Sequence, residues 1–255
     1  MNEKKAWPWI NLVATAVMIT VNVLANALPL NGLNTGEISD SFDIYFVPAG
    51  YVFSIWGLIY LGLIAFAIYQ LLPSQRGNPH IKRIGLLYAV SSAANIAWIF
   101  FWHYELFTLT VPAMLILLVS LIAIFLTLWR GRKELGAGDR WAILAPFSVY
   151  LGWISVATVA NVTQLLYDLG WGGWGISAEA WAVIMLLVAA GIAVAMSIRH
   201  ALAAYLAVFV WAYIGIAIKH GGTPVVGVSA GVLAGVLAIV MVWSALRQRK
   251  TWAVG

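Results

Sequence analysis

The feature that most limits how this chain can fold is a series of long apolar stretches joined by short segments. Along the chain, segments rich in Lys and Arg alternate with segments that contain almost none. Eight stretches can cross about 30 Å of hydrocarbon as helices: Trp9–Leu28, Val47–Leu72, Ile84–Trp102, Leu109–Trp129, Trp141–Leu166, Ala178–Ile198, Ala201–Ile218 and Val225–Leu246. Alternate connecting segments carry 13 of the 14 Lys and Arg residues, and only Lys219 falls on the other side. Because basic segments stay in the cytoplasm, the pattern predicts that both termini are cytoplasmic.

Composition supports the same fold class. The chain is 63% hydrophobic and 9% charged, which excludes a soluble domain with a solvated surface. A spanning segment must satisfy its own backbone hydrogen bonds, so we expect an all-α polytopic membrane protein with about eight transmembrane helices in a lipid bilayer. The net charge of +5 comes from the inner segments and gives no reason to expect a nucleic-acid partner. The absence of cysteine excludes thiolate chemistry and Cys-ligated metal sites.

The first helix and two connecting segments carry further predictions. Lys4 and Lys5, an apolar run and Ala25-Asn26-Ala27 resemble a secretory signal, but the run is long, so a retained membrane helix is favoured. Cleavage would leave seven helices. The polar segment Pro29–Phe46 is expected to form an outward-facing cap. Gly170–Ser177 reads as a flexible loop with Ser177 as the N-cap of the next helix.

The polar residues deep in the apolar stretches are amides. Since no Lys, Arg, Asp or Glu lies deep in a stretch, an ion-driven transporter is disfavoured. The deep amides are Asn22, Asn26, Asn95, Asn161 and Gln164. Two interpretations stay open: hydrogen bonds between helices worth about 1 kcal/mol each, or a few polar contacts inside an apolar ligand pocket.

Aromatic residues favour the pocket. Phe53, Trp56 and Tyr60 follow one another at offsets of three and four, so they share a helix face. Asn95 and Trp98 lie three apart on another helix, at a similar depth. The arrangement predicts a pocket for a flat apolar ligand in the outer half of the bundle, beneath the Pro29–Phe46 segment.

The fourteen tryptophans fall into two groups. Ten lie near helix ends, where membrane interfaces place tryptophan, and are interpreted as anchors: Trp7, Trp9, Trp102, Trp129, Trp141, Trp171, Trp174, Trp181, Trp243 and Trp252. Trp56, Trp98, Trp153 and Trp211 are deeper. Core packing and ligand contact are both open for the first three of these.

At these residues the chain resembles the tryptophan-rich sensory protein (TspO/translocator protein) family. Three blocks carry the resemblance: VPAGYVFSIWGLIYLGL over Val47–Leu63, SSAANIAWIFFW over Ser91–Trp102, and YLGWISVATVAN over Tyr150–Asn161. They occur in the family's order on the second, third and fifth helices. Pro48-Ala49 replaces the family's double proline.

The resemblance implies a compact five-helix bundle, often dimeric, that binds porphyrins and related tetrapyrroles, and in some members sterols. Carried over to this chain, it names the ligand-binding candidates Tyr51, Phe53, Trp56, Tyr60, Asn95, Trp98, Tyr150, Trp153, Ala157 and Asn161. No cofactor is required, and a tetrapyrrole is expected only as a ligand. No basic residue follows Leu166-Tyr167, which makes a sterol less favoured.

The resemblance covers roughly residues 9–168. We therefore predict a TspO-like bundle over residues 1–168 and a three-helix extension over residues 169–255, without a counterpart in the five-helix family. Small residues at Gly227, Gly231 and Gly235 would let another helix approach closely. A second such stripe is formed by Ala89, Ala93 and Ala97. Each stripe serves either internal packing or a homodimer.

The predicted function is that of a receptor or binding protein for a porphyrin or another flat apolar molecule, with a sensory or regulatory role in the bacterial plasma membrane. The alternative is a carrier of a neutral or lipophilic solute, and a purely structural protein would leave the deep aromatics unexplained. An enzyme is not favoured, because the chain lacks cysteine and a buried carboxylate pair. No metal site is predicted; His103 could ligate a haem iron, but an interfacial role is favoured.

Overall fold

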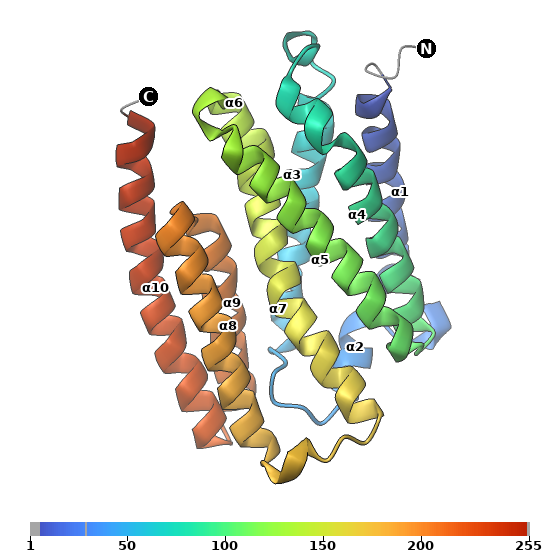
Figure 1. The fold of residues 1–255 in the computed structure, drawn as a ribbon. Coiled ribbons are helices and arrows are strands. Elements are labelled where there is room, and N and C mark those ends of the chain that lie inside the picture. The colour runs from blue at the N-terminus through green and yellow to red at the C-terminus, as the bar shows by residue number, and fades with distance from the viewer. Residues whose placement is uncertain (1–5, 29, 254–255) are drawn as a thin grey trace. The chain divides into compact units, whose positions relative to one another are not determined.

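The computed structural model describes residues 6–28 and 30–253, without the side chains of 249–253, and in this part of the chain helices are joined by turns and loops (Figure 1). Lys4, Lys5 and Pro29, to which the predictions above refer, lie outside these residues, as do the side chains of Arg249, Lys250 and Trp252. Within the described ranges, seven helices are long and apolar enough to cross a membrane. The prediction of an all-α polytopic membrane protein is thereby confirmed.

The long helices follow the predicted apolar stretches closely. They are α1 (Trp7–Ala27), α3 (Ile55–Tyr69), α4 (Pro79–His103), α5 (Phe107–Arg130), α7 (Ala145–Asp168), α8 (Ala178–His200), α9 (Ala203–Lys219) and α10 (Pro224–Ala253). The seventh predicted stretch corresponds to α9, which has 17 residues and is shorter than the seven spans. The second of those spans includes the turn η3 (Gly50–Ser54) and runs over Gly50–Tyr69. At 1.5 Å per residue α9 is about 25 Å long.

Short elements occupy the connecting segments. The predicted cap contains the 3₁₀ turn η2 (Leu30–Gly32) and the short helix α2 (Thr35–Asp40). A second 3₁₀ turn, η3 (Gly50–Ser54), leads into α3. Further 3₁₀ turns are η4 (Pro73–Gln75), η5 (Arg132–Glu134) and η7 (Gly173–Gly175). The fifth apolar stretch is not one regular helix, because α6 (Ala137–Asp139) and the π-helical turn η6 (Arg140–Leu144) precede α7.

The chain forms two compact units. Unit 1 comprises Met1–Ile38 and Trp56–Leu151, and unit 2 comprises Ser39–Ile55 and Gly152–Gly255. The helix α7 begins in unit 1 and ends in unit 2. The units therefore follow a different division from the predicted domains 1–168 and 169–255, whose status as separate domains stays a prediction.

Unit 1 is built on α1, α4 and α5, which lie side by side (Figure 1). Its core contains three aromatic rings in edge-to-face contact, from Phe66, Tyr88 and Phe147, with centroids 5.1 to 5.5 Å apart. The hydroxyl of Tyr88 also shares a 2.6 Å hydrogen bond with Thr15 of α1. Rings in this arrangement gain energy beyond their buried area, and the buried hydroxyl finds a partner.

Unit 2 consists of the loop 39–55, the second half of α7, and the neighbouring helices α8, α9 and α10 (Figure 1). Its loop lies against α9 at Gly215, where an added Cβ would stand 2.2 Å from a methyl carbon of Val52. The Ala49 amide donates to the Gly215 carbonyl over 3.2 Å. The Trp211 indole donates to the Val52 carbonyl over 3.1 Å. A glycine is thus required where the loop backbone meets the helix.

The first stripe of small residues serves internal packing at one end. An added Cβ at Gly227 would stand 2.7 Å from the carbonyl oxygen of His220, so the start of α10 needs a glycine there to pack on the preceding loop. Nothing lies within 4 Å of the same position at Gly235. A homodimer at either stripe stays a prediction.

Candidate functional site

The ten predicted site residues divide equally between the two units. Unit 1 holds Trp56, Tyr60, Asn95, Trp98 and Tyr150. Unit 2 holds Tyr51, Phe53, Trp153, Ala157 and Asn161. Phe53 lies in the turn η3, so it precedes the regular helix that carries Trp56 and Tyr60.

Asn95 of unit 1 links three helices. The Asn22 amide donates to Asn95 Oδ1 over 2.7 Å, and Asn95 Nδ2 donates to the Tyr150 hydroxyl over 3.1 Å. All three side chains are buried, and Asn95 and Tyr150 are 0% exposed. Both ends of the Asn95 amide are therefore engaged in joining α1, α4 and α7, as expected for hydrogen bonds that hold membrane helices together.

The predicted aromatic residues of unit 1 pack on their neighbours. Trp56 stacks on Tyr60 with centroids 5.6 Å apart, and its ring meets Tyr150 edge-on at 6.0 Å. Trp98 stacks on Trp102, one helical turn further along α4, at 5.2 Å. The contact between Trp56 and Tyr150 joins α3 to α7, whereas the other two lie within one helix. Contacts among the protein's own aromatic rings agree with the core-packing interpretation of Trp56 and Trp98.

His103 connects α4 to the cap. Its Nε2 lies 3.0 Å from the Thr35 hydroxyl, and its Nδ1 lies 3.3 Å from the Leu30 carbonyl oxygen. The residue is 0% exposed. Since both ring nitrogens have hydrogen-bond partners in the protein, the arrangement describes a structural histidine better than a haem ligand.

The predicted residues of unit 2 are also mostly packed. Phe53 meets Trp153 edge-on at 5.8 Å, and Tyr51 meets Trp211 in the same way at 5.3 Å. Asn161 is buried, whereas Ala157 is partly exposed. Trp153 and Asn161 lie on one face of α7, eight residues and about two helical turns apart.

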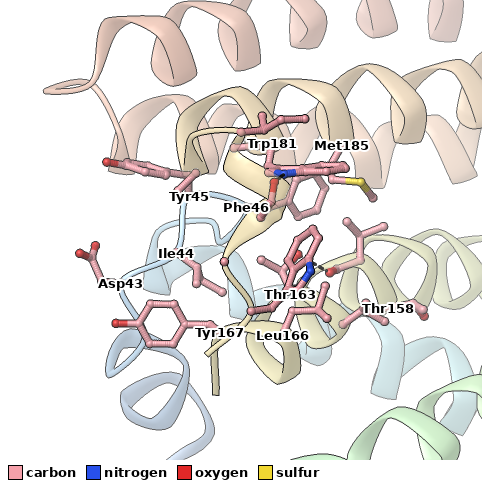
Figure 2. A pocket seen from close by; sticks show the side chains of 18 residues that line it. Asp43, Ile44, Tyr45, Phe46, Thr158, Thr163, Leu166, Tyr167, Trp181 and Met185 are labelled. Atoms are coloured by element: carbon pink, nitrogen blue, oxygen red, sulfur yellow. Dashed lines mark hydrogen bonds between the residues drawn. The ribbon is translucent and has the colours of Figure 1, made fainter. Parts of the chain in front are cut away.

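A pocket of about 540 Å³ lies elsewhere in unit 2, between the second half of α7 and the first half of α8. Figure 2 shows residues 43–46 of the loop along one side of it. The lining residues are Asp43, Ile44, Tyr45, Phe46, Thr158, Val159, Val162, Thr163, Leu166, Tyr167, Trp171, Gly172, Gly173, Ile176, Ala178, Trp181, Ala182 and Met185. The walls are mainly aliphatic and aromatic, and the volume is in the range of small-molecule sites.

None of the ten predicted residues lines this pocket. At about 100° per residue, the α7 residues that line it centre on a face roughly opposite to that of Tyr150, Trp153, Ala157 and Asn161. Two of the lining residues, Trp171 and Trp181, belong to the tryptophans predicted to be interfacial anchors. A tryptophan in a glycine-rich loop, with a second tryptophan in the first turn of the helix that follows, was the signal that could have identified the pocket.

The loop before α8 positions these tryptophans. Trp171, Trp174 and Trp181 contact one another, with centroids 5.3 to 6.0 Å apart. The Trp181 indole donates to the Gly173 carbonyl over 2.8 Å. Gly173 has φ +63°, a conformation that glycine adopts without strain. Ser177 accepts from the Ala180 amide over 3.2 Å, which confirms its predicted role as the N-cap of α8.

Polar contacts fasten the loop over the pocket. The Tyr45 hydroxyl donates to Glu179 over 3.0 Å, and this hydrogen bond raises the pKa of Tyr45 above its usual value. Lys219 forms an ion pair with Asp40. His220 lies 3.1 Å from the Val47 carbonyl oxygen through Nε2, and burial lowers the pKa of its imidazole. The loop that borders the pocket is therefore attached to α8 and to the end of α9.

Comparison with known proteins gave one match. A family model described as TSPO-like protein matches residues 8–243. The match extends beyond residues 9–168, which carry the motifs, and includes all of α8 and α9 and most of α10. Neither the curated proteins nor the solved structures contain a match to the chain.

Proposed function

The chain belongs to the TSPO-like protein family, and from that premise we propose that this integral membrane protein binds a flat, mostly apolar ligand such as a porphyrin or another tetrapyrrole. Binding would serve a sensory or regulatory role. We place the protein in the bacterial plasma membrane with both termini in the cytoplasm, as the distribution of Lys and Arg favours.

The observation that carries this proposal is the pocket between α7 and α8. Phe46, Trp171 and Trp181 offer aromatic surfaces for a flat ring, and Leu166 and Met185 add flexible apolar contacts. Polar groups are few, so they would orient a ligand while dispersion and the hydrophobic effect supply most of the affinity.

The loop 39–55 provides a way for occupancy to be sensed. Residues 43–46 line the pocket, and the same loop is attached through Tyr45 to Glu179 and through Asp40 to Lys219. A ligand that binds better when the loop takes another position would shift the loop's population in proportion to that difference in affinity.

The test is a titration of the purified protein in lipid nanodiscs with the dimethyl ester of protoporphyrin IX, followed by Soret absorbance and tryptophan quenching. The ester removes the carboxylate charges, so the measurement reports the fit of the ring. Two matched substitutions distinguish the faces of α7: Ala182→Leu extends a side chain into the pocket, and Ala157→Leu makes the same change at a predicted residue outside it.

We expect saturable binding that Ala182→Leu weakens about tenfold, because overfilling a packed space costs about 1–3 kcal/mol. Ala157→Leu should change the affinity less than about twofold. The opposite order would move the ligand to the face of Trp153 and Asn161. If no saturable binding is found, a tetrapyrrole-like ligand is rejected. If the protein transports the diester across the membrane of proteoliposomes, it is a carrier and not a receptor.

A further inference from the structure

Three hydroxyl groups of residues that line the pocket are hydrogen-bond acceptors toward a ligand. The hydroxyl of Thr158 donates its hydrogen to the Ile154 carbonyl over 2.6 Å, and that of Thr163 donates to the Val159 carbonyl over 2.9 Å. Tyr45 likewise donates to Glu179. A hydroxyl that has donated its hydrogen presents only lone pairs to a ligand. The three groups therefore favour a ligand that supplies N–H or C–H bonds of positive character.

The charge around the pocket is negative. Asp43 lies at its edge, on the side where Figure 2 shows the hydroxyl oxygens of Tyr45 and Tyr167. Glu179 accepts from Tyr45, and Asp168 directly follows the lining residue Tyr167. Lys219, at the end of α9, is paired with Asp40. None of the lining residues is basic.

The aromatic walls add to the same preference. Trp171, Trp181, Tyr45, Tyr167 and Phe46 all border the pocket. The face of an aromatic ring carries partial negative charge and attracts organic cations, most strongly when the ring is tryptophan. A carboxylate in the same place would meet the negative ring faces and Asp43 with no lining cation to offset them.

We propose that the ligand of this pocket is a flat aromatic compound with a positively charged group, a quaternary or protonated amine, at the edge marked by Asp43. The inference rests on the proposed function, since it assigns the charge of the molecule that the pocket takes. The ring lies against the tryptophans, and the cationic group lies toward Asp43.

The experiment compares three derivatives of one ring. The two propionate groups of protoporphyrin IX are left as carboxylates, converted to methyl esters, or converted to amides that carry a trimethylammonium-ethyl group. Each derivative is titrated against the full chain in nanodiscs of phosphatidylcholine, whose zero net charge keeps the bilayer from sorting the ligands. The substitution Asp43→Asn is compared with Glu134→Gln, which removes an exposed carboxylate in unit 1 that lines no part of the pocket.

We expect the cationic derivative to bind most tightly, the diester less tightly and the dicarboxylate most weakly. The affinity should fall about two- to fivefold from each derivative to the next, as for partly exposed charges. Asp43→Asn should reduce the ratio of the two extremes about fourfold. Glu134→Gln should leave that ratio unchanged. NaCl at 0.5 M should bring the ratio closer to one, because it shortens the Debye length to about 4–5 Å.

The outcomes separate the two proposals. If the diester binds saturably but the carboxylate derivative binds as tightly as the cation, or if Asp43→Asn leaves their ratio intact, the charge preference is wrong and the pocket for a flat ring remains. If none of the three derivatives binds saturably, both proposals are rejected.

Discussion

Two regions that contain aromatic and polar side chains differ in what those side chains leave unfilled. In unit 1, Asn95 hydrogen-bonds to both Asn22 and Tyr150, and all three are buried. In unit 2, the side chains between α7 and α8 surround a pocket of about 540 Å³. The difference teaches that a polar residue deep in a membrane helix marks a ligand site only where its neighbours leave room. Where they satisfy one another, the residue holds helices together.

The largest effect is expected from a substitution that removes the hydrogen bonds of Asn95 in unit 1. Asn95→Leu removes a hydrogen bond from Asn22, whose amide still donates to the Met18 carbonyl, and a hydrogen bond from Tyr150. A buried polar group left without a partner costs about 1–3 kcal/mol. We expect the free energy of unfolding to fall by about 2 kcal/mol, measured by reversible denaturation in mixed micelles. Affinity for the porphyrin diester, measured on the folded fraction, should not change.

A loss of diester affinity in Asn95→Leu without a loss of stability would reverse the assignment and make Asn95 a ligand contact. Tyr150→Phe removes one of the two hydrogen bonds and should cost about half as much stability, which serves as the graded control.

The second effect concerns the wall of the pocket. Trp181→Leu removes an aromatic surface that borders the pocket, and we expect the diester affinity to fall about five- to tenfold. Trp174→Leu changes another member of the same cluster, but Trp174 is 82% exposed and does not line the pocket. The control should therefore keep the original affinity. Equal losses in both variants would show that the loop, rather than the Trp181 surface, determines binding.

A smaller effect is expected where the loop is fastened. Tyr45→Phe keeps the ring at the edge of the pocket but removes the hydrogen bond to Glu179, which is worth about 1 kcal/mol or less at this partly exposed site. The loop 39–55 should become more open to limited proteolysis. The matched variant Tyr167→Phe, at a lining residue with an exposed side chain, should leave cleavage unchanged.

The smallest effect is a pH dependence of the same loop. Burial lowers the pKa of His220, so the folded loop binds a proton less readily than the open loop. Attachment is therefore complete above the usual histidine pKa of about 6.5 and weakens as pH falls below it. Proteolysis of residues 39–55 should increase as the pH is lowered from 7.5 to 5.5, values that lie about one unit to either side of that pKa. His220→Gln should remove the difference, and an unchanged pH response in that variant would assign it to another group.

Sequence patterns predicted the features of this protein that arise within one segment of the chain. The apolar stretches predicted the long helices, since length and hydropathy act within each stretch and need no knowledge of its neighbours. Ser177 was recognised as a cap for the same reason, because its partner, the Ala180 amide, lies three residues away. Family motifs on three helices indicated the family that the match over residues 8–243 shows.

Tertiary structure alone decided which side chains border open space. The pattern of Asn95 and Trp98 is the same whether the amide faces a ligand or Asn22, and only the packing of α1 against α4 places Asn22 there. The pocket depends on the separation of α7 and α8 and on the loop that brings Phe46 to Trp181, residues 135 positions apart. Volume left between packed helices is a property of three or more segments at once, so no local pattern encodes it.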